Sequence, residues 1–172
     1  MRTPAASLVV VSIALALASA CRMQEEPPAS KVSPDPAASS PSAAAPRGLR
    51  FIRAPADDLA ATVRRELAVA KKERRDLLVY VGATWCEPCQ RFHAAAARGE
   101  LDDALAGLTL IELDFDRDGD RLAAAGYVSQ YLPLFAIPGP DGRSSGRHLE
   151  GSIKGEGAVA EIAPRLKRFL GR

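Results

Sequence analysis

The chain has 172 residues, with 23 Lys plus Arg against 21 Asp plus Glu and a net charge of +2. This length allows one ordinary domain plus additional segments and excludes a solenoid or a large multidomain enzyme. The near-neutral charge argues against a protein that binds nucleic acid through the phosphate backbone. Three cysteines are too few for a disulfide scaffold, so a cysteine pair is expected to act chemically.

Residues 1–20 have the pattern of a secretory signal peptide. Arg2 is followed by a charge-free run that is rich in Leu, Val and Ile and ends in small side chains. The apolar stretch is shorter than the roughly 20 residues that a membrane-spanning helix needs. The sequence Leu17-Ala18-Ser19-Ala20-Cys21 resembles a bacterial lipoprotein signal, with Ala18 where Leu is usual. This resemblance implies lipidation of Cys21, while a plain cleaved signal and an uncleaved anchor stay open as alternatives.

Residues 21–48 are dominated by small side chains and proline. After Cys21 the segment holds six Pro, six Ala and five Ser, and three positive charges balance three negative ones. Such a composition buries too little apolar surface to offset the entropy of the chain. We therefore expect a disordered linker that holds a folded domain, residues 49–172, away from a membrane surface.

Helix and strand patterns alternate through the first part of this domain. Apolar residues at spacings of three and four predict an amphipathic helix that Asp57 or Asp58 caps. These apolar residues are Leu59, Val63, Leu67 and Ala70. Residues 77–82 form a short apolar run rich in strand-forming side chains, which is typical of a buried central strand.

The alternation continues in the second part of the domain. The predicted elements are a helix over residues 90–98, a strand over 108–115, a short helix over 120–125, a strand over 131–137, a last strand near 147–150 and a closing helix over about 156–170. The sequence Pro140-Asp141-Gly142-Arg143 predicts a turn before the last strand. A strand pair therefore precedes the closing helix.

The motif Trp85-Cys86-Glu87-Pro88-Cys89 directly follows the buried strand and opens the next helix. Together with the order of the elements, it resembles thioredoxin. The resemblance implies an α/β thioredoxin fold over residues 49–172, with a central mixed β-sheet flanked by helices. It also implies that Pro133, after Leu132, is the cis-proline of the family, and that Gly151 is the glycine of the last strand. The chain is similar to tethered periplasmic domains of the DsbD carboxy-terminal type and to membrane-anchored reductants of cytochrome c maturation.

Cys86 is expected to be the attacking thiol. A cysteine at a helix N-terminus faces unpaired backbone N–H groups and the positive end of the helix dipole, which stabilise the thiolate. Cys89, one turn later, is placed to resolve the mixed disulfide. Pro88 in the first turn loses no needed hydrogen bond and fixes the backbone. We expect thiol-disulfide exchange through a redox-active Cys86–Cys89 disulfide, without an organic or metal cofactor.

The residues between the cysteines favour a reducing function. Glu87 places a negative charge beside the nascent thiolate, which weakens the stabilisation of the thiolate and favours the disulfide. Pro88 resembles the residue of reducing family members, whereas oxidases and isomerases usually have His at this position. A disulfide oxidase or isomerase on the same fold is the alternative.

Tyr80 and Glu112 depart from the thioredoxin pattern. Thioredoxins usually have a buried Asp at the position of Tyr80, where it carries the proton of the resolving thiol, and frequently a Lys at the position of Glu112. We hypothesise that Glu112, with the Tyr80 hydroxyl beside it, takes over this proton transfer. The alternative is that Tyr80 packs in the core and that Glu112 is solvated.

The resemblance also implies a docking surface around Cys86. The cis-proline would bring the backbone of Leu132 and Pro133 beside the nucleophile, where an extended substrate chain can pair with it. Leu132, Trp85 and Pro88 would then form an apolar surface around the sulfur.

Metal binding is a competing interpretation of the cysteine pair. His93 follows Cys89 by four residues on one helix face, so Cys86, Cys89 and His93 could form the site of a copper or zinc metallochaperone. A partly exposed helix histidine is the simpler interpretation, and we expect no metal site. A binding module with idle cysteines is a further alternative.

These expectations combine into one function. We expect an extracytoplasmic thiol-disulfide oxidoreductase on the periplasmic side, anchored to a bacterial membrane by lipid on Cys21, or secreted after plain signal cleavage. Its expected partners are disulfide-containing proteins and a membrane electron donor of the DsbD type, and no nucleic acid is expected to bind.

Overall fold

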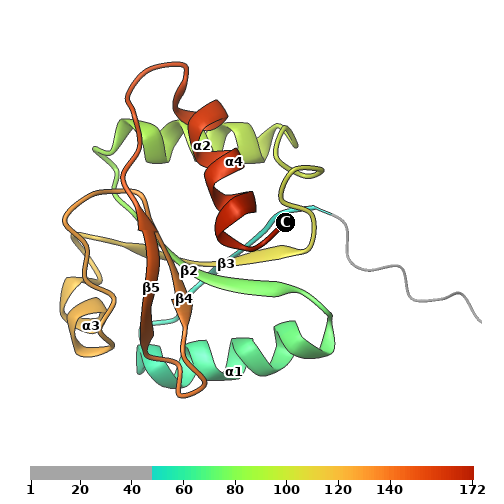
Figure 1. The fold of residues 1–172 in the computed structure, drawn as a ribbon. Coiled ribbons are helices and arrows are strands. Elements are labelled where there is room, and N and C mark those ends of the chain that lie inside the picture. The colour runs from blue at the N-terminus through green and yellow to red at the C-terminus, as the bar shows by residue number, and fades with distance from the viewer. Residues whose placement is uncertain (1–47) are drawn as a thin grey trace, which may run out of the picture. The chain divides into compact units, whose positions relative to one another are not determined.

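A computed structural model describes residues 48–172 (Figure 1). Its helices and strands are β1 (Arg50–Arg53), α1 (Leu59–Lys72), β2 (Asp76–Gly82), α2 (Glu87–Ala97), β3 (Leu108–Asp114), α3 (Gly119–Ala124), β4 (Leu134–Pro138), β5 (Ser144–Glu150) and α4 (Ala158–Phe169). The expected signal peptide, the expected lipidation of Cys21 and the linker before Gly48 lie outside the described residues.

The five strands form one mixed sheet in the order β1-β3-β2-β4-β5. Strands β1, β3 and β2 are parallel, whereas β4 runs antiparallel to β2, and β5 runs antiparallel to β4. In the register of β2 and β3, Tyr80 lies beside Glu112 and Gly82 beside Asp114. This register brings the C-terminal ends of β2 and β3 together, next to the point where α2 begins.

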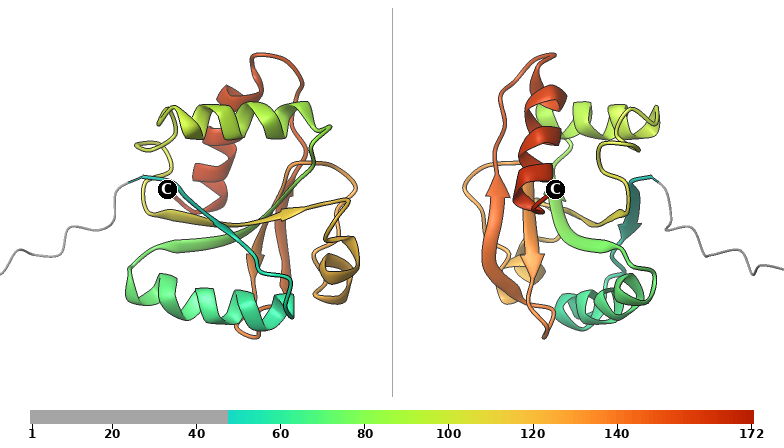
Figure 2. Two further views of the ribbon diagram at one scale, coloured as in Figure 1. Left: turned by 180° about the vertical axis from the view of Figure 1, so that it is seen from behind. Right: turned by 45° about the vertical axis from the view of Figure 1, so that its right-hand side comes forward.

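Helices cover both faces of the sheet. Figure 2 shows α2 and α4 together on one face and α1 on the other. The side chains of β2 alternate between these layers, with Leu77, Val79 and Val81 in the cluster under α1, and Leu78 and Tyr80 in the cluster under α2 and α4. A strand that is buried on both faces has a continuous apolar sequence, which explains the run in β2. The structure has the predicted thioredoxin fold.

The first helix begins as the sequence predicts. The Asp58 carboxylate accepts a hydrogen bond from the backbone N–H of Ala61 at 2.8 Å and caps α1. Lys71 and Lys72 occupy the last turn, where positive charge stabilises the helix dipole.

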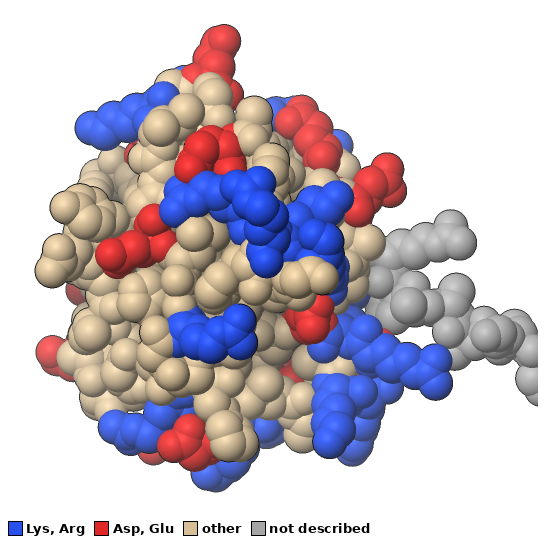
Figure 3. Space-filling model, in the orientation of Figure 1, with Lys and Arg blue, Asp and Glu red and all other residues tan. Residues whose placement is uncertain are grey.

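Both signs of charge are present on the domain surface. Figure 3 shows Lys and Arg side chains lying among Asp and Glu side chains on one face of the molecule. Lys167 and Arg168 lie in the last turn of α4, where their positive charge stabilises the helix dipole as the lysines of α1 do. Within residues 48–172, no helix is both long enough and apolar enough to cross a membrane.

Strand β1 and the start of β4 differ from what the sequence predicts. Strand β1, which has only four residues and lies at the edge of the sheet, is not predicted. Strand β4 begins at Leu134 and not at Tyr131, because the preceding residues form a loop that Glu150 holds. The Glu150 carboxylate accepts hydrogen bonds from the Ser129 hydroxyl at 2.5 Å and from the Gln130 backbone N–H at 3.1 Å.

Candidate active site

The two cysteines lie at the start of α2. Cys86 is the N-cap residue of this helix, and Pro88 lies in the first turn. Cys86 and Cys89 form a disulfide and are 4% and 2% exposed. The backbone N–H of Cys89 donates a hydrogen bond to Cys86 Sγ at 3.3 Å. A backbone donor at this place stabilises negative charge on the sulfur when the disulfide is reduced.

The loop before β4 packs against the disulfide. The Leu132–Pro133 peptide bond is cis, as expected, and Leu132 packs against the cluster that contains both cysteines. The Pro133 carbonyl accepts a hydrogen bond from the Gly151 backbone N–H at 2.9 Å, which ties this loop to the end of β5. Gly151 has φ +68°, and an added Cβ would lie 3.2 Å from the Cβ of Tyr131. The catalytic role of Pro133 stays a prediction.

A cavity of about 330 Å³ opens beside Cys86. Its lining residues are Trp85, Cys86, Glu87, Pro88, Phe115, Ser129, Gln130, Tyr131, Leu132, Gly151, Ser152 and Lys154, and we call this space the docking cavity. The three residues expected to form an apolar surface, Trp85, Pro88 and Leu132, are therefore brought together. Phe115 and Tyr131 are not predicted as site residues, because each is an aromatic residue in a separate loop with no local pattern.

The aromatic rim of the docking cavity is open to solvent. Trp85 is 63% exposed and Tyr131 is 64% exposed, although large apolar side chains are usually covered. The Trp85 indole N–H donates to an Asp116 carboxylate oxygen at 2.7 Å, and the Trp85 ring meets the Phe115 ring edge-on. These contacts hold the indole at the rim of the cavity that Cys86 also lines, with much of its surface open to solvent.

Glu87 forms part of the docking cavity and contacts two other elements. Its Oε1 atom accepts hydrogen bonds from Arg91 Nε at 2.8 Å and from the Gly155 backbone N–H at 3.2 Å. The hydrogen bond from Arg91, and secondly that from Gly155, hold the pKa of Glu87 below its usual value. Glu87 is therefore ionised near neutral pH, and Arg91 balances part of its charge.

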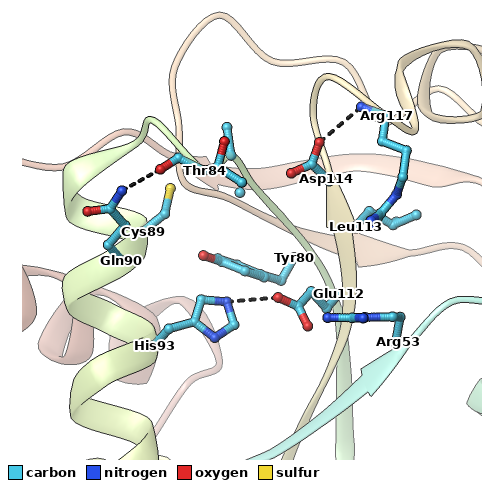
Figure 4. A pocket seen from close by; sticks show the side chains of 12 residues that line it. Arg53, Tyr80, Thr84, Cys89, Gln90, His93, Glu112, Leu113, Asp114 and Arg117 are labelled. Atoms are coloured by element: carbon cyan, nitrogen blue, oxygen red, sulfur yellow. Dashed lines mark hydrogen bonds and ion pairs between the residues drawn. The ribbon is translucent and has the colours of Figure 1, made fainter.

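A second cavity, of about 310 Å³, borders Cys89 (Figure 4). His93 from α2 and Glu112 from β3 both line it, and His93 Nε2 lies 3.0 Å from Glu112 Oε1. This hydrogen bond is the main reason that the pKa of Glu112 is lowered, with further contributions from the positive charges of Arg53 and Arg117. We call this space the proton cavity because it combines Cys89, the expected resolving cysteine, with titratable side chains.

Tyr80 is fully buried at the floor of this region. Its ring packs against Phe51, Phe92, His93 and Phe135. Within the described residues, its hydroxyl has no hydrogen-bond partner. Burial, together with the charge of Glu112, raises the pKa of Tyr80, so the phenol stays protonated.

The structure thus modifies both interpretations of Tyr80 and Glu112. Tyr80 packs in the core, as the simpler interpretation has it, but Glu112 is paired with His93 instead of being merely solvated. This pair is not predicted from the sequence. The spacing of four residues between Cys89 and His93, which the metal-binding interpretation also uses, places both on one face of α2 towards β3 and is the signal for this pair.

Comparison with known families agrees with this geometry. Residues 58–140, which include both cysteines and the cis-proline, match the thioredoxin-like family. This part of the chain is thioredoxin-like. Among solved structures, chloroplastic thioredoxin z is similar at 21% sequence identity, with a TM-score of 0.40, over 73% of this chain and 96% of that chain. No curated protein matches the chain. A thioredoxin-like fold with a Cys86–Cys89 disulfide indicates thiol-disulfide redox chemistry.

The three residues of the metal-binding interpretation, Cys86, Cys89 and His93, have other contacts in this structure. Among residues 48–172, no group of three or more His, Cys, Asp or Glu side chains is arranged to hold a metal ion. His93 turns its Nε2 atom towards Glu112, while both cysteine sulfurs are engaged in the disulfide.

Proposed function

We propose that this protein is an extracytoplasmic, membrane-tethered thiol-disulfide oxidoreductase that reduces disulfides in protein substrates. The observation that carries the proposal is the Cys86–Cys89 disulfide at the N-terminus of α2, next to an exposed apolar cavity. The tether rests on the signal-like sequence of residues 1–20, on Cys21 and on the composition of the linker.

The reaction consists of two exchanges. In the reduced protein, Cys86 Sγ attacks one sulfur of a substrate disulfide, forms a mixed disulfide with it and releases the other substrate sulfur as a thiolate. Cys89 then loses its proton and attacks Cys86 Sγ, which forms the Cys86–Cys89 disulfide and releases the second substrate sulfur. The substrate gains two electrons, and the protein dithiol loses them. A membrane electron donor of the DsbD type restores the dithiol by the reverse exchange.

The docking cavity supports a protein substrate. Trp85, Phe115 and Tyr131 expose large ring surfaces around the rim, and a flexible polypeptide can cover such surfaces with apolar side chains. Leu132 lies at the same place, where an extended chain could approach the sulfur of Cys86.

Glu87 supports the reducing direction. Its negative charge lies next to Cys86 and opposes the thiolate, although the contact with Arg91 reduces the effect. Reduction potential separates this function from that of an oxidase, since thioredoxin has a potential of about −270 mV and the oxidase DsbA about −120 mV.

Trapping of mixed disulfides tests the proposal. In the full chain, Cys89→Ser should accumulate protein partners attached through Cys86, and dithiothreitol should release them. Cys86→Ser, which changes the neighbouring buried cysteine of the same motif, is the matched control and should trap nothing. Equal amounts of adduct with the two variants, or failure of the reduced wild-type chain to reduce insulin, would overturn the proposal.

A further inference from the structure

The resolving cysteine needs an acceptor for its proton. Cys89 is only 2% exposed, so its thiol has little direct contact with bulk water. The residue at the position of the usual thioredoxin carboxylate is Tyr80, which is also fully buried. Since the phenol stays neutral, it can donate a hydrogen bond but cannot act as the base.

The proton cavity contains a different base. It shares none of its lining residues with the docking cavity, so it stays available when a substrate chain is bound at Cys86. Figure 4 shows His93 and Glu112 pointing toward each other from α2 and β3, while the hydroxyl end of Tyr80 is directed toward α2 near Cys89. Both members of the pair line the same cavity as Cys89.

We propose that the His93–Glu112 pair takes up the proton of Cys89 during the resolving step and passes it to solvent. This inference deepens the proposed function and rests on it. The S–H bond of Cys89 breaks, the proton crosses the proton cavity through water, and an N–H bond forms at Nδ1 of His93, because Nε2 already donates to Glu112. The imidazole–carboxylate pair becomes an imidazolium–carboxylate pair, and Cys89 Sγ becomes the thiolate that attacks Cys86 Sγ.

The exposure of His93 and Glu112 and the distance between them fit a base and the residue that positions it. The His93 side chain is 37% exposed, so it can exchange a proton with solvent, and that of Glu112 is 27% exposed. A neutral imidazole has one ring nitrogen that can accept a proton, which is the chemistry that this transfer needs. Glu112 holds the His93 ring at 3.0 Å and stabilises the imidazolium, and thus acts as a positioning residue.

The other charged groups around the pair act mainly on Glu112. Arg53 from β1 and Arg117 after β3 line the proton cavity and stabilise the ionised carboxylate of Glu112. Asp114, at the end of β3, adds one negative charge to the same cavity. Because Glu112 is kept ionised, the pair stores the transferred proton on the imidazole rather than on the carboxyl group.

The reaction of the reduced chain with Ellman's reagent separates the two thiols. A Cys21→Ser background of the full chain leaves two cysteines. Cys86 releases the first coloured thiolate by attacking the reagent, and Cys89 releases the second by attacking the mixed disulfide. His93→Gln should leave the first phase unchanged and slow the second at pH 7 by about 10-fold or more, because general bases contribute about 100-fold to 10,000-fold.

The pH profile and a second variant complete the test. In the wild-type background the second phase should level off once imidazole is neutral, whereas in His93→Gln it should keep rising with hydroxide concentration. Added imidazole should restore the second phase of His93→Ala. His148→Gln, which changes an exposed histidine on β5 outside both cavities, is the matched control and should behave like wild type.

The outcomes distinguish the two proposals. A wild-type chain without a second phase would overturn the proposed function itself. A normal second phase in His93→Gln, with an unchanged pH profile, would overturn only the role of the pair. An equal slowing of both phases, without rescue of His93→Ala by imidazole, would also overturn it, because the effect would then be structural.

Discussion

Replacing Tyr80 with Phe tests how the buried hydroxyl of Tyr80 affects the stability of the domain. The side chain is 0% exposed, and the hydroxyl has no hydrogen-bond partner among the described residues. A buried polar group without a partner costs about 1–3 kcal/mol. Tyr80→Phe should therefore raise the free energy of unfolding by about 1 kcal/mol, which corresponds to an increase in melting temperature of about 3–6 °C for a domain of this size.

Tyr127 provides a matched control for this substitution. It is also buried, at 3% exposed, but its hydroxyl donates a hydrogen bond to the Gly142 carbonyl at 2.9 Å. Tyr127→Phe should lower the free energy of unfolding by about 1–2 kcal/mol, because the carbonyl loses its donor. Urea unfolding of the oxidised full chain, followed by circular dichroism, measures both values. A loss of 1 kcal/mol or more in Tyr80→Phe would refute the reasoning.

The remaining predictions concern the motif and the fold. Glu87→Gln should shift the reduction potential slightly towards more oxidising values, because loss of the charge stabilises the Cys86 thiolate, and glutathione equilibration measures this. Glu100→Gln, which also removes a partner of an arginine, is its control, and a more reducing potential would contradict the account. Gly142→Ala should destabilise the domain by about 3 kcal/mol or more in urea unfolding, since an added Cβ at φ +82° would lie 2.0 Å from a backbone oxygen. Gly146→Ala, at φ +81° in open space, should lower the free energy of unfolding by about 1 kcal/mol. Equal losses of stability in Gly142→Ala and Gly146→Ala would reject this reasoning.

Elements with a strong local pattern could be predicted from the sequence. Strand β2 is an unbroken apolar run because both of its faces are covered, and Asp58 marks the start of α1 through its hydrogen bond to Ala61. Strand β1 gives no such signal. Its four residues lie at the sheet edge and are only partly buried, so their strand conformation depends on pairing with β3. Pairing of this kind is set by tertiary contacts and not by propensity.

Some residues of the candidate site are indicated by the sequence, and others are brought together only by the fold. The cysteines, Trp85 and Pro88 are contiguous, and their chemistry follows from the start of a helix, so one motif was enough to indicate them. Contact between His93 and Glu112 depends on the packing of α2 across β3, which is a relation between distant parts of the chain. The same limit applies to Phe115, which reaches the docking cavity from the loop after β3.

The central claim is that the start of α2 stabilises the thiolate of Cys86. The most direct test is the rate of alkylation of Cys86 by iodoacetamide as a function of pH, measured by mass spectrometry of the cysteine-containing peptide. The reduced full chain should show a midpoint at least about one pH unit below that of the same chain unfolded in urea, where a cysteine titrates near 8.5. Coinciding midpoints in the folded and unfolded chains would contradict the account.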